Sequence, residues 1–249
     1  MTAAPDISRP ILSRGSIAAL AGLTAAVALI GATLSTRGSD LSVLPDTVAV
    51  TRPAGLWVQR HEVTVADWNR CAADGACARA LPPRPGQDPA TTPATRINQP
   101  AAVAYAAWIS DRTGHPFRLP TAAEWDAVAA DVVDRAKDPL FSQPELDWAS
   151  AYLIGERKTR ALRATGGFST SPDGVVDLDG SVWEWTSDCY AGSAGATDPD
   201  RCPAFWVGGE HLAAIPYLES DPARGGCAVG QPPAHLGLRL VTDRAPPDK

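Results

Sequence analysis

The sequence predicts an α+β domain with few helices, many short strands and long irregular loops. Helix-capping patterns mark only a few segments, whereas alternating apolar residues mark several short strands. The 21 glycines and 23 prolines are spread without a period, as expected of a folded, loop-rich domain. The 249 residues suffice for one domain of about 200 residues and a short appendage.

The charge balance argues against nucleic acid as the main partner. The formal net charge is -6, and no basic stripe is visible along the chain. Because phosphate backbones are bound by a basic face, we expect no nucleic-acid partner.

The N-terminal segment is predicted to anchor the protein in the inner membrane. Ser16 to Leu34 carry no charge and approach the roughly 20 apolar residues that a membrane-spanning helix needs. Arg9 and Arg14 precede this run, which predicts that the tail before it stays in the cytoplasm. A cleaved signal peptide is the alternative, with Thr33 and Ser35 as an imperfect cleavage pattern.

Both readings place the rest of the chain in the periplasm, where disulfides form. The expected organisation is a cytoplasmic tail at residues 1–15, an anchor or signal segment at 16–35, a linker at 36–54 and the domain at 55–249.

The first half of the domain is expected to begin with a strand and a short helix. Apolar residues alternate through residues 56–65, which favours a strand, and residues 66–73 fit a helix ended by Asp74 and Gly75. Residues 81–96 are rich in proline and predict an irregular loop.

Two further helices are marked by their ends. Pro100 fits a first helical turn and Gly114 a helix C-terminus. Thr121 and Glu124 have capping-box spacing, which predicts a helix running to about Asp134. One side of the first of these helices is expected to carry Val103, Ala106, Ala107 and Ile109.

The second half is expected to consist of short strands. Residues 137–179 predict only short strands and turns. A strand at Val182–Thr186 would place Trp183 and Trp185 on one face and Glu184 on the other. Further strands are expected at residues 205–208 and 237–241.

Four stretches together resemble the formylglycine-generating-enzyme, or sulfatase-modifying factor, family. They occur in the family's order and are HEVTVADWNRC (61–71), AAVAYAAWISDRTGHPFRLPTAAEWDAVA (101–129), DLDGSVWEWTSD (177–188) and LGLRLV (236–241). The resemblance implies a C-type-lectin-like fold with short antiparallel strands, two main helices and long loops. Here the predicted transmembrane helix would precede that fold.

The motif residues also have a plain structural interpretation. Large tryptophans anchor loop-rich folds, and buried polar groups are normally satisfied by partners. We expect a structural role for Arg118, Glu124, Trp125, Trp183, Glu184, Trp185 and Arg239.

The spacing of the five cysteines predicts disulfides. Cys71 and Cys77 flank a short turn, and Cys189 and Cys202 flank a loop rich in glycine and alanine. A metal site is the alternative, although no CxxC spacing supports zinc. Cys227 is then left alone as a weak catalytic candidate. It is either a small idle residue or a redox or metal group with His211 or His235.

The resemblance implies an oxidase activity for some members of the family, and that activity depends on a pair of cysteines. Oxygen-dependent members of the family hold copper(I) between two cysteines that follow a GGSW-like turn, and soft thiolates suit that ion. The matching stretch here, Val207–Ile215, contains no cysteine. We therefore expect no copper.

Calcium is the other cofactor that the resemblance implies. Family members often bind it around a GNxWEW motif, where this chain has Ser181, Val182 and Glu184, with Asp177 and Asp179 nearby. Serine is a weaker ligand than asparagine, and backbone carbonyls would have to complete the shell of six to eight oxygens.

Four functions follow as hypotheses. The favoured one is a non-catalytic accessory or maturation factor for a periplasmic partner, because relatives of this layout resemble accessory proteins associated with nitrite reductase. The second is an oxygen- and copper-dependent oxidase that converts a client cysteine to formylglycine. The third is an iron enzyme that couples sulfur to histidine-derived betaines, and the fourth is a lectin-like ligand-binding module that uses residues 81–96 and 191–220.

Overall fold

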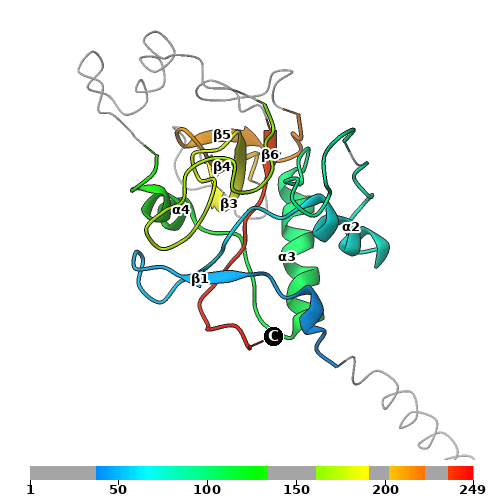
Figure 1. Ribbon diagram of the computed structural model, residues 1–249. Coiled ribbons are helices and arrows are strands. Elements are labelled where there is room, and N and C mark those ends of the chain that lie inside the picture. The colour runs from blue at the N-terminus through cyan, green and yellow to red at the C-terminus, as the bar shows by residue number, and fades with distance from the viewer. Residues whose placement is uncertain (1–37, 83, 134–160, 191–201, 222–234, 249) are drawn as a thin grey trace, which may run out of the picture. The chain divides into compact units, whose positions relative to one another are not determined.

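A computed structural model describes residues 38–82, 84–133, 161–190, 202–221 and 235–248 (Figure 1). Within these ranges, no helix is both long enough and apolar enough to cross a membrane. The anchor predicted at residues 16–35 lies outside the described residues, as do Cys227 and much of 137–179. The described residues from Ser39 onward belong to one compact unit.

A three-stranded antiparallel sheet joins the two ends of this unit. Its order is β1 (Thr47–Ala49), β2 (Trp57–Gln59) and β7 (Val241–Thr242). Val58 lies opposite both Val48 and Val241, and all three pack into one apolar cluster. The strand expected at residues 56–65 is therefore much shorter than its alternating pattern suggested.

The segment expected as a linker at residues 36–54 is in large part built into the fold. A short 3-10 helix, η1 (Leu41–Val43), and strand β1 both lie in it. Leu44 and Val50 are buried at 4% and 5% exposure. The sequence does not indicate this, because apolar residues spaced so irregularly carry no helical or strand period. In the fold, Leu44 packs in an apolar cluster with residues of two helices, and Val50 packs in the cluster that contains Val58 of β2.

A four-stranded sheet carries the WEW motif. Its order is β5 (Ala213–Pro216), β4 (Ala204–Gly208), β3 (Val182–Cys189) and β6 (His235–Gly237). Neighbours are antiparallel except β3 and β6, which run parallel. The purely antiparallel sheet that we expected is therefore wrong at this pair, whose long chain separation provides the crossover that parallel strands need.

The final strand expected at residues 237–241 is split in two. Gly237 ends β6 in one sheet and Val241 begins β7 in the other. Arg239 lies between them, and its position follows from this change of sheet.

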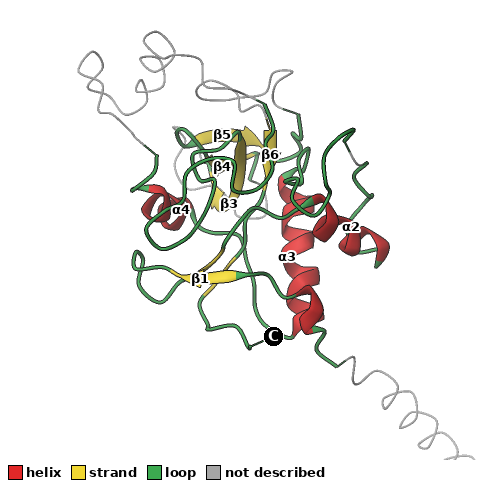
Figure 2. Ribbon diagram, in the orientation of Figure 1, coloured by secondary structure: helices red, strands yellow, loops and turns green. Residues whose placement is uncertain are grey.

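Three α-helices occur in the described ranges (Figure 2). In α2 (Val65–Ala73) the Thr64 hydroxyl accepts from the Asp67 amide at 3.2 Å. In α3 (Gln99–Thr113) Asn98 caps the start, and Gly114 ends the helix at φ 66. In α4 (Ala122–Ala129) the capping box of Thr121 and Glu124 is present as predicted.

Two details of these helices differ from expectation. Helix α4 ends at Ala129 instead of Asp134, and the Val132 and Val133 amides both donate to the Ala129 carbonyl in the turn that follows. In α3, Val103 is 47% exposed and Ala107 is exposed as well. The buried side carries Ala102, Tyr105, Ala106, Trp108 and Ile109. The tryptophan and tyrosine determine which face turns inward, because they bury the largest apolar area.

Two apolar clusters fill the core. The first gathers α2, α3 and the four-stranded sheet and contains Trp183 and Trp185. The second lies under the three-stranded sheet and α4 and contains Trp125. Trp183 and Trp185 share one cluster while Glu184 faces elsewhere, which confirms the alternation expected for this strand.

Candidate functional site

A buried ion pair joins the VWEWT segment of β3 to the LGLRLV segment. Arg239 Nη2 lies 2.8 Å from Glu184 Oε1, and Arg239 Nε lies 3.1 Å from Glu184 Oε2. Each side chain is 1% exposed. Two parallel contacts of this kind give the pair a fixed geometry as well as a strong interaction.

Arg239 also joins segments that are far apart in the chain. Its Nη1 donates to the backbone carbonyls of Gln59 and Arg60, and its Nη2 donates to that of Val176. One guanidinium therefore satisfies acceptors at the end of β2 and in the loop before β3. Through these contacts Arg239 and Glu184 join separate segments of the fold.

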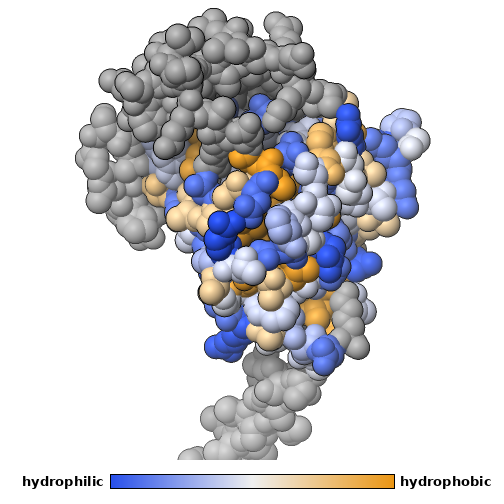
Figure 3. All heavy atoms as spheres, turned by 60° about the vertical axis from the view of Figure 1, so that its left-hand side comes forward, coloured by the Kyte–Doolittle hydropathy of each residue, from blue (hydrophilic) through white to orange (hydrophobic). Residues whose placement is uncertain are grey.

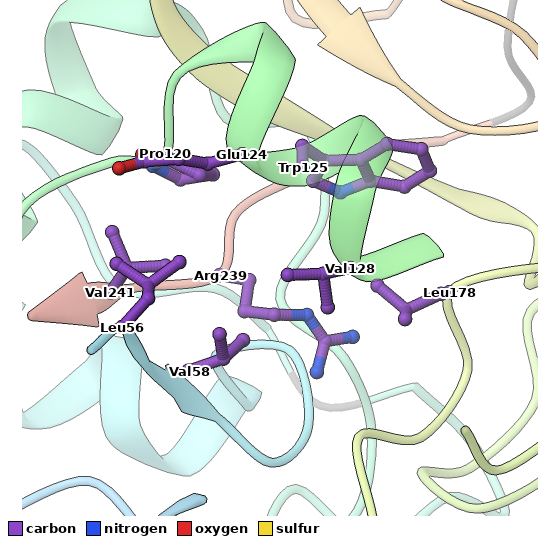
Figure 4. A pocket seen from close by; sticks show the side chains of 9 residues that line it. All are labelled: Leu56, Val58, Pro120, Glu124, Trp125, Val128, Leu178, Arg239 and Val241. Atoms are coloured by element: carbon purple, nitrogen blue, oxygen red, sulfur yellow. The ribbon is translucent and has the colours of Figure 1, made fainter. Parts of the chain in front are cut away.

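Trp125 connects helix α4 to this ion pair. Its indole Nε1 donates to Glu184 Oε2 at 2.8 Å. Figure 4 shows the indole of Trp125 above the Arg239 side chain, with Val128 drawn between the two in that view. A small pocket is lined by Leu56, Val58, Pro120, Glu124, Trp125, Val128, Leu178, Arg239 and Val241. This lining offers one carboxylate and one guanidinium, and both are already held in ion pairs.

A third ionisable residue at the centre, Glu62, was missed by sequence reasoning. It is 2% exposed, and its Oε2 lies 3.8 Å from Arg239 Nη2 without a hydrogen-bond partner in the described residues. Burial raises the pKa of Glu62 to about 8, opposed by Arg239 and assisted by Glu184 and Asp177. The only sign of it in the sequence is an acidic residue within residues 56–65, whose alternating pattern predicts a strand.

A second network lies at the surface. Arg118 donates to both oxygens of Glu124, at 2.7 and 2.8 Å, and to Asp243 at 2.7 Å. The Arg118 guanidinium lowers the pKa of Glu124, which also accepts from the Thr121 amide at the start of α4. This network attaches α4 to the segment after β7. It is separate from the buried ion pair.

The described residues do not fit a calcium site built on Glu184. Its two oxygens face Arg239 and Trp125, and the Ser181 hydroxyl donates to the Ala161 carbonyl at 3.1 Å. In the described part of the chain, no cluster of three His, Cys, Asp or Glu side chains could hold a metal ion. A carboxylate neutralised by a guanidinium is a poor calcium ligand, because calcium needs oxygens that are not already engaged.

The carboxylates of the nearby aspartates are also engaged in hydrogen bonds. Asp177 accepts from the amides of Gly166 and Phe168, and Asp179 accepts from the amide and hydroxyl of Ser169. These contacts order the loop before β3. Val182 begins that strand, where it is paired with His235 of β6.

The turn in which the resemblance places a cysteine pair is tightly packed. A Cβ added to Gly208 would lie 2.1 Å from the Trp125 ring, and one added to Gly209 would lie 2.3 Å from the Trp183 ring. The same Trp183 meets His211 edge to face at 4.6 Å. After the turn, Ala213, Ala214 and Ile215 are completely buried. Indole rings and β5 fill this region, and it holds no thiol.

Both predicted disulfides are present. Cys71 is bonded to Cys77 and Cys189 to Cys202, which excludes the alternative metal site for these four residues. Cys227, the weak catalytic candidate, lies outside the described residues. The sequence suggested His211 or His235 as a partner for Cys227. His235 begins β6 and lies, in the sequence, far from the turn that contains His211.

Comparisons with known proteins agree with this fold. The family profile of the sulfatase-modifying factor enzyme 1-like domain matches residues 23–244. A formylglycine-generating enzyme of Mycobacterium tuberculosis is 28% identical over 215 residues, which cover 73% of this chain and 69% of that protein. A formylglycine-generating enzyme of Thermomonospora curvata is 28% identical over 140 residues, covering 51% of this chain and 44% of that protein.

Among solved structures, PvdO from Pseudomonas aeruginosa aligns with a TM-score of 0.49 and 19% identity, over 75% of this chain and 79% of that one. The chain thus spans less than half of the Thermomonospora relative and about two thirds of the Mycobacterium relative.

Proposed function

Because the chain belongs to the sulfatase-modifying factor enzyme 1-like family, we propose that it is a non-catalytic member of that family. On this proposal it is anchored by its N-terminus in the inner membrane and serves another periplasmic protein as an accessory or maturation factor. It keeps the scaffold of its relatives and uses it for binding.

The number of cysteines left outside the disulfides is the observation on which this proposal rests. The chain has five cysteines, and two disulfides use four of them, so that Cys227 is the one thiol left. A copper(I) dithiolate needs two thiolates from the same site. The packed turn after β4 supports the same conclusion. A client would have to reach a reactive cysteine pair in this region, but Ala213 and Ala214 are buried there.

Exposed apolar side chains support a protein partner. On the face in Figure 3, hydrophilic and hydrophobic residues are interspersed. Tyr217 and Leu218 follow β5 at 40% and 61% exposure, and Val103 of α3 is 47% exposed. The Gln99 amide at the start of α3 donates to the Tyr217 carbonyl, so this turn lies beside the helix end that carries Val103. Tyrosine and leucine side chains presented in this way suit a contact with another protein.

The first experiment counts thiols in the full-length protein. After denaturation and alkylation without reduction, intact mass should show one modified cysteine, mapped to Cys227. The same protein, with copper(I) and oxygen, should leave a cysteine-containing client peptide unchanged, as should the Cys227→Ser variant. Conversion of the peptide by the wild-type protein, lost in Cys227→Ser, would replace the accessory reading by the oxidase.

The second experiment looks for the partner. Full-length protein expressed at its native level and extracted in mild detergent should co-purify with a periplasmic protein. The resemblance suggests testing a copper nitrite reductase in particular. Leu218→Asp should reduce recovery of the partner, whereas Ala245→Asp, at another exposed position, should not. Recovery of a monodisperse protein without a partner would contradict the proposal.

A further inference from the structure

Two arginines stand at the ends of the proline-rich loop of residues 81–96. The structure brings these ends together, because Arg84 Nη2 donates to the Thr95 hydroxyl at 3.0 Å. Thr95 is 5% exposed and directly precedes Arg96, which is exposed. A buried hydroxyl thus fixes the position of one guanidinium next to the residue that carries the other.

Neither of these two arginines is paired with an acid in the part of the chain that the structure describes. Ion pairs with Asp or Glu are made by Arg52, Arg60, Arg70, Arg112, Arg118 and Arg239. Within the described ranges, neither Arg84 nor Arg96 makes such a pair.

The electrostatic consequence appears at Arg84. Partial burial lowers the pKa of this residue, and the nearby charge of Arg96 lowers it further. The two cations therefore disfavour one another, and a bound anion would relieve both effects.

The loop between the arginines is held rigidly. Asp88, the acid within it, accepts from the Ala90 amide through Oδ1 at 2.9 Å, and its carbonyl accepts from the Thr92 amide. The Val65 amide donates to the Thr92 carbonyl, and the Ala94 amide donates to the Val63 carbonyl. The start of α2 therefore braces the loop, and a rigid loop loses little conformational entropy when it binds a ligand.

The backbone at Arg96 is unusual as well. Its φ of 64 lies in the left-handed region, which in the described residues is otherwise occupied by glycines and by Asp177. Non-glycine residues held there are often found at ligand sites. The sequence uses arginine where glycine would be less strained.

We propose that Arg84 and Arg96 form a binding site for an oxyanion, presented either as a carboxylate of an acidic polypeptide segment or as a free inorganic anion. The planar guanidinium fork matches the two oxygens of such a group. This inference stands apart from the accessory function: the site would hold its anion whether or not the protein has a catalytic thiol pair.

The test measures binding to the full-length protein with two probes, hexaglutamate and inorganic phosphate, by calorimetry at low ionic strength. The Arg84→Gln/Arg96→Gln double variant should weaken binding by about tenfold or more. The control is Arg79→Gln/Arg244→Gln, which removes the same charge from two exposed arginines and should change the affinity by less than about twofold. Binding of the peptide alone identifies an acidic segment as the source, and equal binding of phosphate identifies a free anion.

Arg96→Gly separates binding from folding. Glycine relieves the left-handed backbone, so this variant should unfold at the same or a higher temperature while it binds the probe more weakly. The proposal is overturned if the wild-type protein binds neither probe at millimolar concentration. It is equally overturned if the Arg84/Arg96 double variant binds as tightly as the wild-type protein.

Discussion

Arg239 and Glu184 form a two-point ion pair in the centre of the domain, with 1% of each side chain exposed. The pair is closed from one side by the Trp125 indole and from another by three backbone carbonyls. The pair joins β2, β3 and the segment between β6 and β7.

Truncation of Arg239 should unfold the domain more readily than any surface change. Arg239→Ala leaves Glu184 charged and buried, and removing one partner of a buried pair costs about 3–5 kcal/mol of unfolding free energy. Urea denaturation followed by tryptophan fluorescence measures the loss. The matched variant is Arg118→Ala, whose ion pair with Glu124 is 37% exposed on the arginine side and should cost about 1 kcal/mol or less. Equal losses of unfolding free energy in the two variants would show that the buried ion pair stabilises the domain no more than the exposed one.

Glu62→Gln should make the stability of the protein less dependent on pH. The folded-state pKa of Glu62, about 8, lies above its ordinary value of 4.5, so between these pH values the folded protein holds a proton that the unfolded chain releases. The contribution of Glu62 to wild-type stability therefore falls as pH rises through this window and levels off above it.

The glutamine variant lacks this loss. The unfolding free energy of the variant should exceed that of the wild-type protein only slightly at pH 4.5, and by a few kcal/mol above pH 8. Thermal denaturation across pH 4–9 measures the difference. Glu210→Gln, an exposed control, should give a curve parallel to the wild-type one. A difference in unfolding free energy between Glu62→Gln and the wild-type protein that does not change with pH over this range would refute the raised pKa of Glu62.

Gly209→Ala should disturb the turn between β4 and β5. The added methyl group would meet the Trp183 ring at 2.3 Å, so that either the indole or the turn must move. Overpacking of this kind costs about 1–3 kcal/mol. Near-ultraviolet circular dichroism and urea denaturation report the two effects together. Gly38→Ala, where a Cβ meets nothing within 4 Å, is the control and should leave both signals unchanged.

The two disulfides should contribute unequally. Cys71 and Cys77 are separated by 6 positions, and Cys189 and Cys202 by 13. A cross-link restricts the unfolded chain more when it closes a longer loop, and each doubling of the loop adds about 0.6 kcal/mol. Replacing both members of the second pair by serine should therefore lower the unfolding free energy by more than the same change in the first pair. A larger loss for Cys71 and Cys77 would point to packing as the dominant effect, since both are buried.

The features that the sequence predicted best were those with local causes. Capping at Thr121, the stop at Gly114 and both disulfides follow from the chemistry of a few neighbouring residues. Family motifs supplied the domain type, which the profile match confirms.

The features that it predicted poorly depend on pairing between distant segments. No local period marks β1, which exists because β2 lies beside it. Nothing within the final motif shows that Gly237 and Val241 end up in different sheets. Glu62 looks like an ordinary strand residue until the fold brings it to Arg239, at a sequence distance over which no spacing rule operates.

The position of Arg239 near the end of the chain also has a consequence for biosynthesis. Its hydrogen bonds reach back about 180 positions to Gln59, and β7 completes the sheet that β1 and β2 begin. A nascent chain that has emerged only as far as β5 exposes β2 without its partner and Glu184 without its counter-charge. Such long-range closure is slow. The three-stranded sheet and the buried ion pair can therefore close only after the chain as far as β7 has been made, and until then the free edge of β2 is open to pairing with other chains.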